Sequence, residues 1–429
     1  MQRRILFLYV GERLTGALIS MLGLINNLPE TSYEIMIAAN HPEIINERVA
    51  GANIKVRLAA LKTWSMIKED YWLWLHDQKL TWMQRKAREW WHFLRFIHSL
   101  AGQITILRRL KREFQPDILH INGSSLIAAG VAGRLLHIPV VWHIRGILAN
   151  NIWAAIARAI IVQTSAAIVC VSEAAAAPFA KARYKVQVVT NPVDTDQFQS
   201  EVQMVNDPID TERFQPAESR KLRREWGIPD TVTCVGYIGK FSHAKGTFDL
   251  LEAAAAIIAA QPNVRFLMVG YGTPDVEAQM KRKIAAPGLE QYFHFTGVRQ
   301  DIPAVLASLD IVISPSWSEG APRTVIEAMA MQKPIVATNI AAVAELIEHG
   351  KSGLLVSPRQ PGELAGAVLQ MIRHPQFAGE CAKAAYQAFH QRYLAQSSMQ
   401  MIDQLYTHIA SQKSNNRRPP GMIPDYPER

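Results

Sequence analysis

Short apolar runs alternate with helix-like segments along most of the chain, and this alternation restricts the possible folds more than any other feature. Several runs are continuously apolar, which is typical of parallel strands that are covered on both faces. In the first half of the chain they are Ile5–Val10, Glu34–Ala38, Ile118–Ile121, Val140–His143, Ala167–Val171 and Val186–Val189. In the second half they are Val232–Ile238, Arg265–Val269, His294–Phe295, Ile311–Ser314, Ile335–Ala337 and Gly353–Val356.

Two such series in one chain predict an α/β protein with two Rossmann-like, doubly wound domains that face each other across a cleft. A chain of 429 residues is also too long for one typical core. We expect ligands outside the carboxyl ends of the strands. The predicted parts are a first domain at 1–190, a linker at 191–229, a second domain at 230–391, a helix at 392–412 that returns toward the first domain, and a disordered tail at 413–429.

The predicted linker contains a tandem duplication. The stretch "VQVVTNPVDTDQFQ" begins at Val186 and is echoed by "VQMVNDPIDTERFQ" from Val202. Two copies do not make a solenoid, so we interpret them as a lengthened connection between the domains. In the last predicted helix, apolar side chains at helical spacing indicate packing against a core; they are Met399, Ile402, Leu405, Tyr406 and Ile409.

The charge and the cysteines restrict the class of protein. A formal net charge of +9 favours an anionic partner such as a nucleotide, a phospholipid surface or a nucleic acid, although a basic solvated surface would give the same total. No RNA- or DNA-binding motif is present, so we expect no nucleic acid. Cys170, Cys234 and Cys381 are widely spaced, which argues against disulfides or a zinc site and fits a reducing cytoplasm. The apolar runs at Ile5–Val10 and Ile152–Val171 are too short or too interrupted for a signal peptide or a bilayer span.

Six of the ten tryptophans lie between Trp64 and Trp91, interleaved with lysine and arginine, and "LRRLKREF" follows at Leu107. Tryptophan and cationic side chains on one helix suit the headgroup layer of a membrane. Alternatively, Trp72, Trp82 and Trp90 pack inward and the charges face water. We expect residues 64–112 to form a surface that contacts a membrane.

The stretch "SEGAPRTVIEAMAMQKPIVAT", from Ser318 to Thr338, places a loop, a helix and a strand in succession. Pro322 is well suited to the start of the helix, whose first-turn N–H groups attract a phosphate. Glu319 precedes that turn, and Glu327 lies further along, where a carboxylate could bind a diol. Such a layout suits a nucleotide-sugar. The alternative is that Glu319 caps the helix and Glu327 is solvated.

These residues resemble the signature of the family 4 retaining glycosyltransferases, which have the GT-B fold. The likeness includes "EAMAMQKPIVAT" from Glu327, "GYIGKFSHAKGTFDLLEAA" from Gly236 and "FHFTGVRQDIPAVLASLDIVISPS" from Phe293. In the first half, "DILHINGS" from Asp117 and "VVWHIRG" from Val140 also match. The resemblance implies transfer of a sugar, with retention, from a UDP- or GDP-sugar to a glycan or lipid-linked acceptor in cell-surface polysaccharide or lipopolysaccharide synthesis, at the cytoplasmic side of the membrane.

The resemblance also implies site residues in the second half. Lys240, where the family usually has arginine, and Lys245 would neutralise the diphosphate leaving group, and Glu319 would orient the sugar. Gly270 would approach the nucleoside, and the backbone of Val298 and Arg299 would pair with the base. The remaining donor-binding candidates in this half are Gly239, Gly320, Ala321, Pro322, Arg323, Thr324, Val325 and Glu327.

In the first half the resemblance implies fewer residues. His143 would face the donor sugar and phosphate, with a satisfied core histidine as the alternative. Arg145 could serve an anionic acceptor or a phosphate. Gly16 is the candidate for backbone contact near the diphosphate, because the family's early glycine loop is altered here.

No metal and no cofactor are expected. The D-x-D string at Asp194–Asp196 imitates a metal site, but it follows a strand and matches an ordinary family segment. The lysines and the helix N-terminus would take the place of a cation. Two alternatives remain: a nucleotide-sugar epimerase on the same fold, and a non-catalytic nucleotide-sugar-binding protein.

Overall fold

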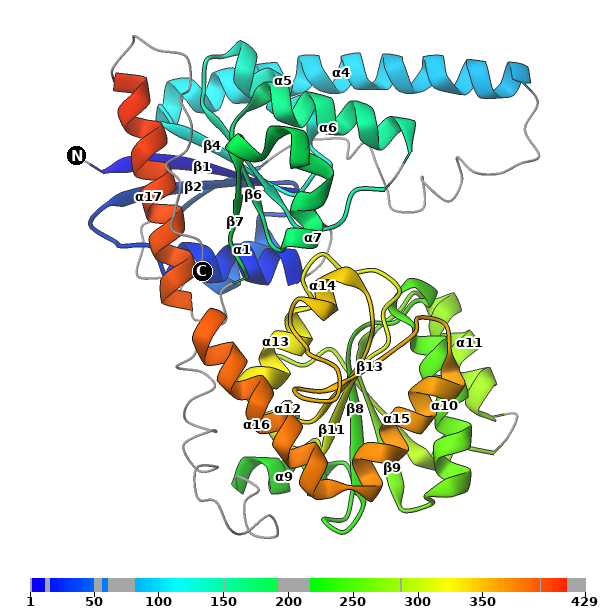
Figure 1. Cartoon of the computed structure of the whole chain (residues 1–429). Helices are drawn as coiled ribbons and strands as arrows, with labels where there is room; N and C mark the ends of the chain where they lie inside the picture. The colour runs from blue at the N-terminus through cyan, green and yellow to red at the C-terminus, as the bar shows by residue number, and fades with distance from the viewer. Residues whose placement is uncertain are drawn as a thin grey trace. The chain divides into compact units, whose positions relative to one another are not determined.

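The structure is a computed structural model that describes residues 2–11, 16–49, 56–60, 82–149, 151–191, 217–285, 288–393 and 395–414. The chain forms two compact units, one made of Met1–Pro192 with Gln396–Arg429 and the other of Val193–Ala395 (Figure 1). Predictions for the tryptophan-rich segment up to residue 81, for most of the duplicated linker with its D-x-D string, and for residues 415–429 lie outside the described residues.

The first unit is built on a parallel sheet, which in its described part has the strand order β3-β2-β1-β4-β5-β6-β7. Its strands are β1 (Arg3–Tyr9), β2 (Tyr33–Ala39), β3 (Val56–Ala60), β4 (Ile118–Asn122), β5 (Val140–Ile144), β6 (Ser165–Cys170) and β7 (Val186–Val188). The helical segments are α1 (Gly16–Asn26), α2 (Glu43–Val49), α4 (Trp82–Phe114), α5 (Ile127–Leu135), α6 (Ile152–Thr164), α7 (Glu173–Ala176), η1 (Ala177–Lys185) and α17 (Ala395–Ser414).

The second unit repeats this plan, with the strand order β10-β9-β8-β11-β12-β13 and parallel pairing throughout its described residues. Its strands are β8 (Thr233–Lys240), β9 (Val264–Tyr271), β10 (Phe293–Gly297), β11 (Ile311–Ser314), β12 (Ile335–Thr338) and β13 (Leu354–Val356). Its helices are α9 (Ala217–Glu225), α10 (Thr247–Ala260), α11 (Pro274–Ala285), α12 (Ile302–Ala307), α13 (Arg323–Ala330), α14 (Ala341–Ala344), α15 (Pro361–Arg373) and α16 (Pro375–Arg392), with the short turns η2 (His243–Lys245) and η3 (Glu290–Tyr292).

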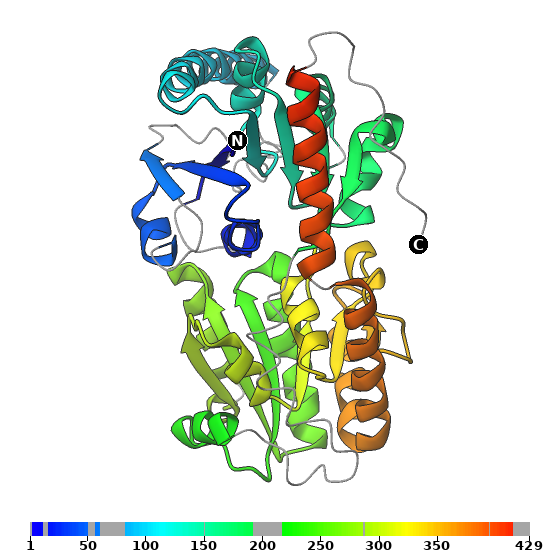
Figure 2. The ribbon, with the colours of Figure 1, turned by 90° about the vertical axis from the view of Figure 1, so that its left-hand side faces the viewer.

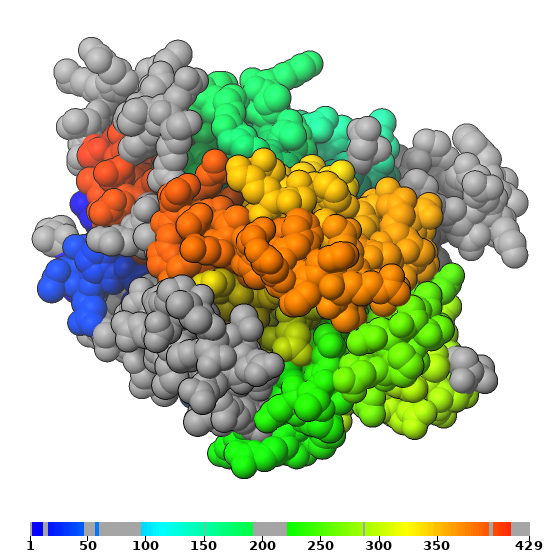
Figure 3. All heavy atoms as spheres, turned by 60° about the horizontal axis from the view of Figure 1, so that its bottom comes forward, coloured from blue at the N-terminus to red at the C-terminus, as the bar shows by residue number. Residues whose placement is uncertain are grey.

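Each sheet is buried by helices because its strands are apolar on both faces. In the second unit one cluster packs around α13 and α16, and another packs around α10 and α15. Figure 3 shows the atoms of α15 and α16 side by side across one face of this unit. The strand-helix alternation of the sequence therefore predicts the fold class correctly.

The last helix, α17, returns to the first unit, as the sequence predicts. It stands against the first sheet (Figure 2), and its five apolar side chains at helical spacing join the cluster formed by β1, β2 and α1. Its polar contacts also lie in that unit, because Tyr33 donates to Asp403 with 2.5 Å between the oxygens. No helix in the described part of the chain is long and apolar enough to cross a membrane.

Two elements depart from the sequence analysis. Strand β3 pairs with β2 at the sheet edge, yet its sequence, VRLAA, carries only a weak strand signal. Helix α9 lies inside the range assigned to the linker. It packs on the second unit, where Leu222 is buried and Ile228 follows in the same cluster.

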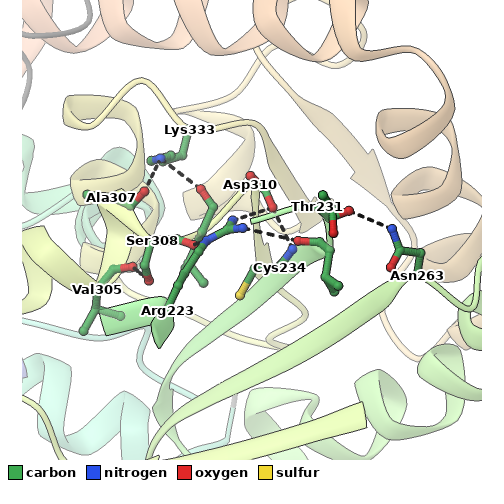
Figure 4. A network of polar contacts seen from close by, with 11 residues as sticks. Arg223, Thr231, Cys234, Asn263, Val305, Ala307, Ser308, Asp310 and Lys333 are labelled. Carbon is green, nitrogen blue, oxygen red and sulfur yellow. Dashed lines mark hydrogen bonds and ion pairs between the residues drawn. The ribbon is translucent and has the colours of Figure 1, made fainter. Parts of the chain in front are cut away.

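Helix α9 is anchored by a buried arginine (Figure 4). The guanidinium of Arg223 donates to the carbonyl oxygens of Ser308 at 2.8 Å and Val232 at 3.3 Å, and to Asp310 Oδ2 at 2.7 Å. The same Asp310 oxygen accepts the backbone N–H of Cys234 at 2.7 Å. One side chain thereby ties α9 to both β8 and the loop before β11.

Candidate active site

The residues predicted to bind the donor gather along the carboxyl edge of the second sheet. Because all its strands are parallel, the segments that follow β8, β9, β10 and β11 meet at this one edge. Lys240 and Gly270 end or nearly end their strands, Val298 follows β10, and Glu319 follows β11. The structure therefore brings these four predicted residues to one edge of the sheet.

The loops after β8 and β11 are held against each other by close backbone contact. Gly246 has φ +66°, and a Cβ atom there would lie 1.9 Å from the carbonyl oxygen of Pro315. Nearby, the backbone N–H of Trp317 donates to the carbonyl of Ala244 at 2.9 Å. Only glycine suits position 246, since it tolerates the left-handed conformation and has no side chain to clash.

This contact brings Lys245 and Glu319 together. Lys245 Nζ lies 2.6 Å from Glu319 Oε1, and the Ser316 hydroxyl donates to the same oxygen at 2.7 Å. The side chains are 33% and 15% exposed, so the pair is accessible to a ligand but largely desolvated. Both bonds use Oε1, and neither uses Oε2.

A buried tyrosine supports the lysine side of the site. Tyr237 donates its hydroxyl to the carbonyl of Lys240 at 2.8 Å. Burial raises the pKa of Tyr237 far above its usual value, and the Glu319 carboxylate adds to the shift. The tyrosine is therefore neutral, and it fixes the end of β8.

Helix α13 begins beside Glu319. Pro322 occupies the N-cap position, with no side-chain capping bond. The N–H groups of Val325 and Ile326 donate to the carbonyl of Pro322 at 3.0 and 3.3 Å. The two N–H groups before them have no carbonyl one turn back in the helix, so this end of α13 carries partial positive charge. Thr324 donates to the carbonyl of Ile238 at 3.1 Å, which ties this turn to β8.

Glu327 lies one turn into α13. Its side chain is buried and accepts from Arg323 Nε at 2.6 Å. A solvated Glu327 and a helix-capping Glu319 were the alternative predictions for this stretch. Both are wrong, because Glu327 is buried in an ion pair and Glu319 bonds to Lys245 and Ser316.

Two predicted donor-binding glycines, in β8 and β9, are explained by backbone packing within the sheet. Gly239 and Gly270 are partners in the sheet, with φ of +157° and +140°. A Cβ atom on Gly270 would lie 1.8 Å from the carbonyl oxygen of Gly239. Glycine is thus required at position 270 for strand packing, and a contact with a nucleoside stays a prediction.

Val298 and Arg299 lie after β10. Val298 is exposed, whereas the Arg299 guanidinium bonds to both carboxylate oxygens of Asp301, at 2.8 and 2.5 Å. These bonds lower the pKa of Asp301. The guanidinium also lies over the ring of Trp226. The proposed pairing of a base with this backbone stays a prediction.

Sequence reasoning missed the residues that surround the Lys245–Glu319 pair in the β11 loop and its partners. Besides Ser316, Trp317 donates its indole N–H to Asp249 Oδ2 at 2.6 Å, and Arg359 lies over its ring at 4.2 Å. These residues come from the β11 loop, from α10 and from the turn after β13. No spacing in the sequence connects segments so far apart, although the tryptophan next to the site is a weak signal.

In the first unit, His143 is buried near the end of β5, and Nε2 has no hydrogen-bond partner among the described residues. Arg145 follows the strand and donates to the side-chain oxygens of Asn122 at 2.8 Å and Asn191 at 2.5 Å. Gly16 begins α1, and residues 12–15 before it lie outside the described residues. A role for Gly16 stays a prediction.

His120 and Tyr406 also lie here, and sequence reasoning assigned them no function. His120 Nε2 lies 3.2 Å from His143 Nδ1, and the Tyr406 hydroxyl lies 2.6 Å from His120 Nδ1. The signal for His120 was a histidine inside an apolar strand. Tyr406 carried no signal besides its helical spacing.

Two parallel α/β units of this kind form the GT-B fold. HepE of Anabaena, solved in complex with UDP and glucose, superposes with a TM-score of 0.75 at 20% identity, and the match covers 95% of this chain and 100% of HepE. Residues 38–197 match the family model "Glycosyltransferase Family 4", and residues 232–374 match "Glycosyl transferases group 1". The chain therefore belongs to the family of glycosyltransferases that these two models together describe.

Curated relatives agree with this assignment. The 2-deoxystreptamine glucosyltransferase of Streptomyces kanamyceticus is 27% identical over 300 residues, which cover 64% of this chain and 73% of the relative. The lipopolysaccharide core biosynthesis mannosyltransferase LpsB of Rhizobium meliloti is 32% identical over 175 residues, which cover 40% of this chain and 46% of the relative.

Proposed function

We propose that the chain transfers a sugar, with retention of configuration, from a UDP- or GDP-sugar to a glycan or lipid-linked acceptor in cell-surface polysaccharide or lipopolysaccharide synthesis. The observation that carries the proposal is the Lys245–Glu319 pair beside the N-terminus of α13. A cation, free amide groups and a partly buried carboxylate at one sheet edge suit a diphosphate and the sugar attached to it.

The chain's own residues divide the work in this proposal. Lys240, Lys245 and the first turn of α13 stabilise the negative charge that develops on the diphosphate as the sugar–oxygen bond breaks. Glu319 Oε2 accepts a hydrogen bond from a sugar hydroxyl and orients the ring. The acceptor oxygen bonds to the anomeric carbon on the side that the leaving group vacates, and its proton passes to a diphosphate oxygen.

We propose that this reaction needs no metal ion, since ammonium groups and amide dipoles neutralise the diphosphate. Activity that persists in excess EDTA supports this part, and activity that is lost with EDTA and restored by Mg²⁺ or Mn²⁺ contradicts it.

The reaction is tested with radiolabelled UDP- and GDP-sugars, scored for nucleotide diphosphate release with and without a membrane extract. We expect release that depends on the extract, a labelled product with retained anomeric configuration, and a loss of turnover of about 100-fold or more in Glu319→Ala. Release without any acceptor would favour the epimerase alternative. Donor binding without turnover would favour the non-catalytic alternative. Near-normal turnover of Glu319→Ala would contradict the role of the pair.

We further propose that the first unit contacts the inner face of the cell membrane. The C-terminal end of α4 has a hollow of about 490 Å³ lined by Arg108, Lys111 and Arg112 together with Gln115 and Pro116. Helix α5 packs against both α4 and α6, and α6 exposes Ile152, Trp153 and Ile156. A hollow lined by cations and exposed apolar side chains on the same unit both suit an anionic lipid surface.

The membrane proposal is tested by flotation with vesicles of anionic or neutral lipid. We expect binding to anionic vesicles that weakens at high salt and in the triple variant Arg108→Gln, Lys111→Gln, Arg112→Gln. Equal recovery with and without vesicles would contradict it.

A further inference from the structure

A chain of three buried polar side chains runs from the last helix to His143. Tyr406 of α17, His120 of β4 and His143 of β5 are each at most 1% exposed. The Tyr406 hydroxyl lies 2.6 Å from His120 Nδ1, and His120 Nε2 lies 3.2 Å from His143 Nδ1. The chain ends at His143 Nε2, which is buried and has no partner among the described residues.

All three groups are neutral at physiological pH. Burial lowers the pKa of His120 to about 3, and the nearby Arg145 adds to the shift. Burial and Arg145 likewise hold the pKa of His143 well below its usual value. Burial raises the pKa of Tyr406 well above its usual range. Each histidine therefore carries one ring hydrogen, and the tyrosine keeps its own.

Only two directions of hydrogen bonding satisfy both contacts. In the first, Tyr406 donates to His120 Nδ1, His120 Nε2–H donates to His143 Nδ1, and His143 holds its hydrogen on Nε2. In the second, every bond is reversed, so the tyrosine hydroxyl accepts and its own hydrogen needs another acceptor. Among the described residues, the structure gives that hydroxyl no hydrogen-bond contact besides His120.

The first direction is favoured because it leaves fewer buried polar groups unpaired, and each unpaired group is costly. The second leaves two, the Tyr406 hydroxyl hydrogen and the bare Nε2 of His143. The first direction leaves one hydrogen of the chain without an acceptor, the one on His143 Nε2. That hydrogen lies near the carboxyl end of β5, where parallel sheets bind their ligands. The second direction would leave the hydroxyl hydrogen of Tyr406 unpaired in the core.

We propose that Tyr406 and His120 are positioning residues that fix His143 in the tautomer with its hydrogen on Nε2, so that His143 donates a hydrogen bond to an oxygen of the bound substrate. In this tautomer Nδ1 is occupied by His120 and Nε2 has no free lone pair. His143 therefore does not act as a base toward the acceptor. The proposal rests on the proposed glycosyl transfer only for the identity of that oxygen.

The tautomer is tested directly on the full chain. Long-range proton–nitrogen NMR spectra of protein labelled with ¹⁵N-histidine distinguish a nitrogen that carries hydrogen from one that does not. His143→Gln identifies the His143 signals by their loss. We expect a hydrogen-bearing Nε2 and a bare Nδ1 in the unmodified protein, and a mixture of tautomers in Tyr406→Phe. A hydrogen on Nδ1 in the unmodified protein would overturn the proposal.

Turnover provides the second readout, measured with whichever sugar donor the radiolabelled assay of the proposed function identifies. Tyr406→Phe should lower kcat/KM by about threefold to tenfold, because only the correct tautomer binds productively. Tyr33→Phe is the matched control. It removes another buried hydroxyl that bonds α17, through Asp403, but that does not contact His120. We expect this variant to keep normal kcat/KM.

A double-mutant cycle separates positioning from support of the fold. Glutamine at 143 presents an N–H donor near the place of Nε2 and has no tautomers, so His143→Gln should retain more activity than His143→Ala. When Tyr406→Phe is added to His143→Gln, kcat/KM should not fall any further. An equal loss in both backgrounds would mean that Tyr406 only supports the fold, and would overturn the proposal.

The two proposals fail in different ways. Should no nucleotide-sugar be turned over, the proposed function and the use of the tautomer in it fall together, while the NMR result still decides the tautomer. Should turnover occur without any effect of Tyr406→Phe, glycosyl transfer stands and the positioning role falls.

Discussion

The buried guanidinium of Arg223 gives a sharp test of how the second unit is held together. Replacement by methionine keeps a stem of similar length and removes all three hydrogen bonds of the side chain. Two carbonyl oxygens lose a donor, and Asp310 keeps only the N–H of Cys234 among the bonds of this network. Removing one partner of a buried ion pair costs about 3–5 kcal/mol.

The exposure of the two partners decides where in that range the loss falls. The Arg223 side chain is 1% exposed, whereas that of Asp310 is 39% exposed. Water can therefore solvate the carboxylate once the guanidinium is gone, and we expect the low end, about 3 kcal/mol. For a unit of this size such a loss lowers Tm by about 10 °C.

The assay is thermal unfolding followed by calorimetry, with Arg224→Met as the control. Arg224 is the next residue of α9 and is exposed, so its replacement should change the stability by no more than about 0.5 kcal/mol. Adding Asp310→Asn to Arg223→Met should recover part of the loss, because no unpaired charge then remains. Equal Tm values for Arg223→Met and Arg224→Met would refute the reasoning.

Three further predictions follow from the described contacts. Gly246→Ala should destabilise the second unit by more than Gly288→Ala in urea titrations. Both positions have left-handed φ, so alanine at either is strained by about 1–3 kcal/mol. Only at position 246 would the new Cβ atom also clash with a backbone atom. Lys245→Ala should lower kcat in the donor assay by about 100-fold, because Lys245 bonds to Glu319 and neutralises the diphosphate; a kcat close to that of the unmodified protein would contradict the site. Acid should weaken the first unit, because the pKa values of His120 and His143 are depressed in the folded state. Below about pH 6.5 the unfolded chain therefore binds more protons than the folded chain. The free energy of unfolding then falls by up to about 1.4 kcal/mol per pH unit for each histidine. Urea titrations between pH 7 and pH 5 should show this slope, and His120→Asn with His143→Asn should reduce it.

The sequence predicts the fold well because its strands carry a strong local signal. The run Ile311–Ser314, for example, becomes a strand in which all four residues are buried. Strand β3 is the exception, since VRLAA contains a charge and two alanines and becomes a strand only by pairing with β2. Pairing with a neighbouring strand therefore stabilises an extended conformation for which the local sequence has little propensity.

The candidate site is predicted in part. Lys245 and Glu319 were found as separate motif residues, and the structure joins them with a bond of 2.6 Å. Ser316 and Trp317, with their partners in α10 and after β13, were not found, because contacts between distant segments leave no periodicity. The same reason explains Tyr406, whose helical spacing indicates burial but not its bond to a histidine far earlier in the chain.

The placement of α17 has a consequence for how the polypeptide is made. The first unit consists of two stretches of sequence, and the second stretch follows the whole of the second unit. Ile402, Leu405 and Tyr406 belong to the core around β1 and α1, yet they leave the ribosome after all the residues of the second unit. The half that begins synthesis is therefore the half that completes its core last, and a fragment ending near residue 192 would lack one wall of that core.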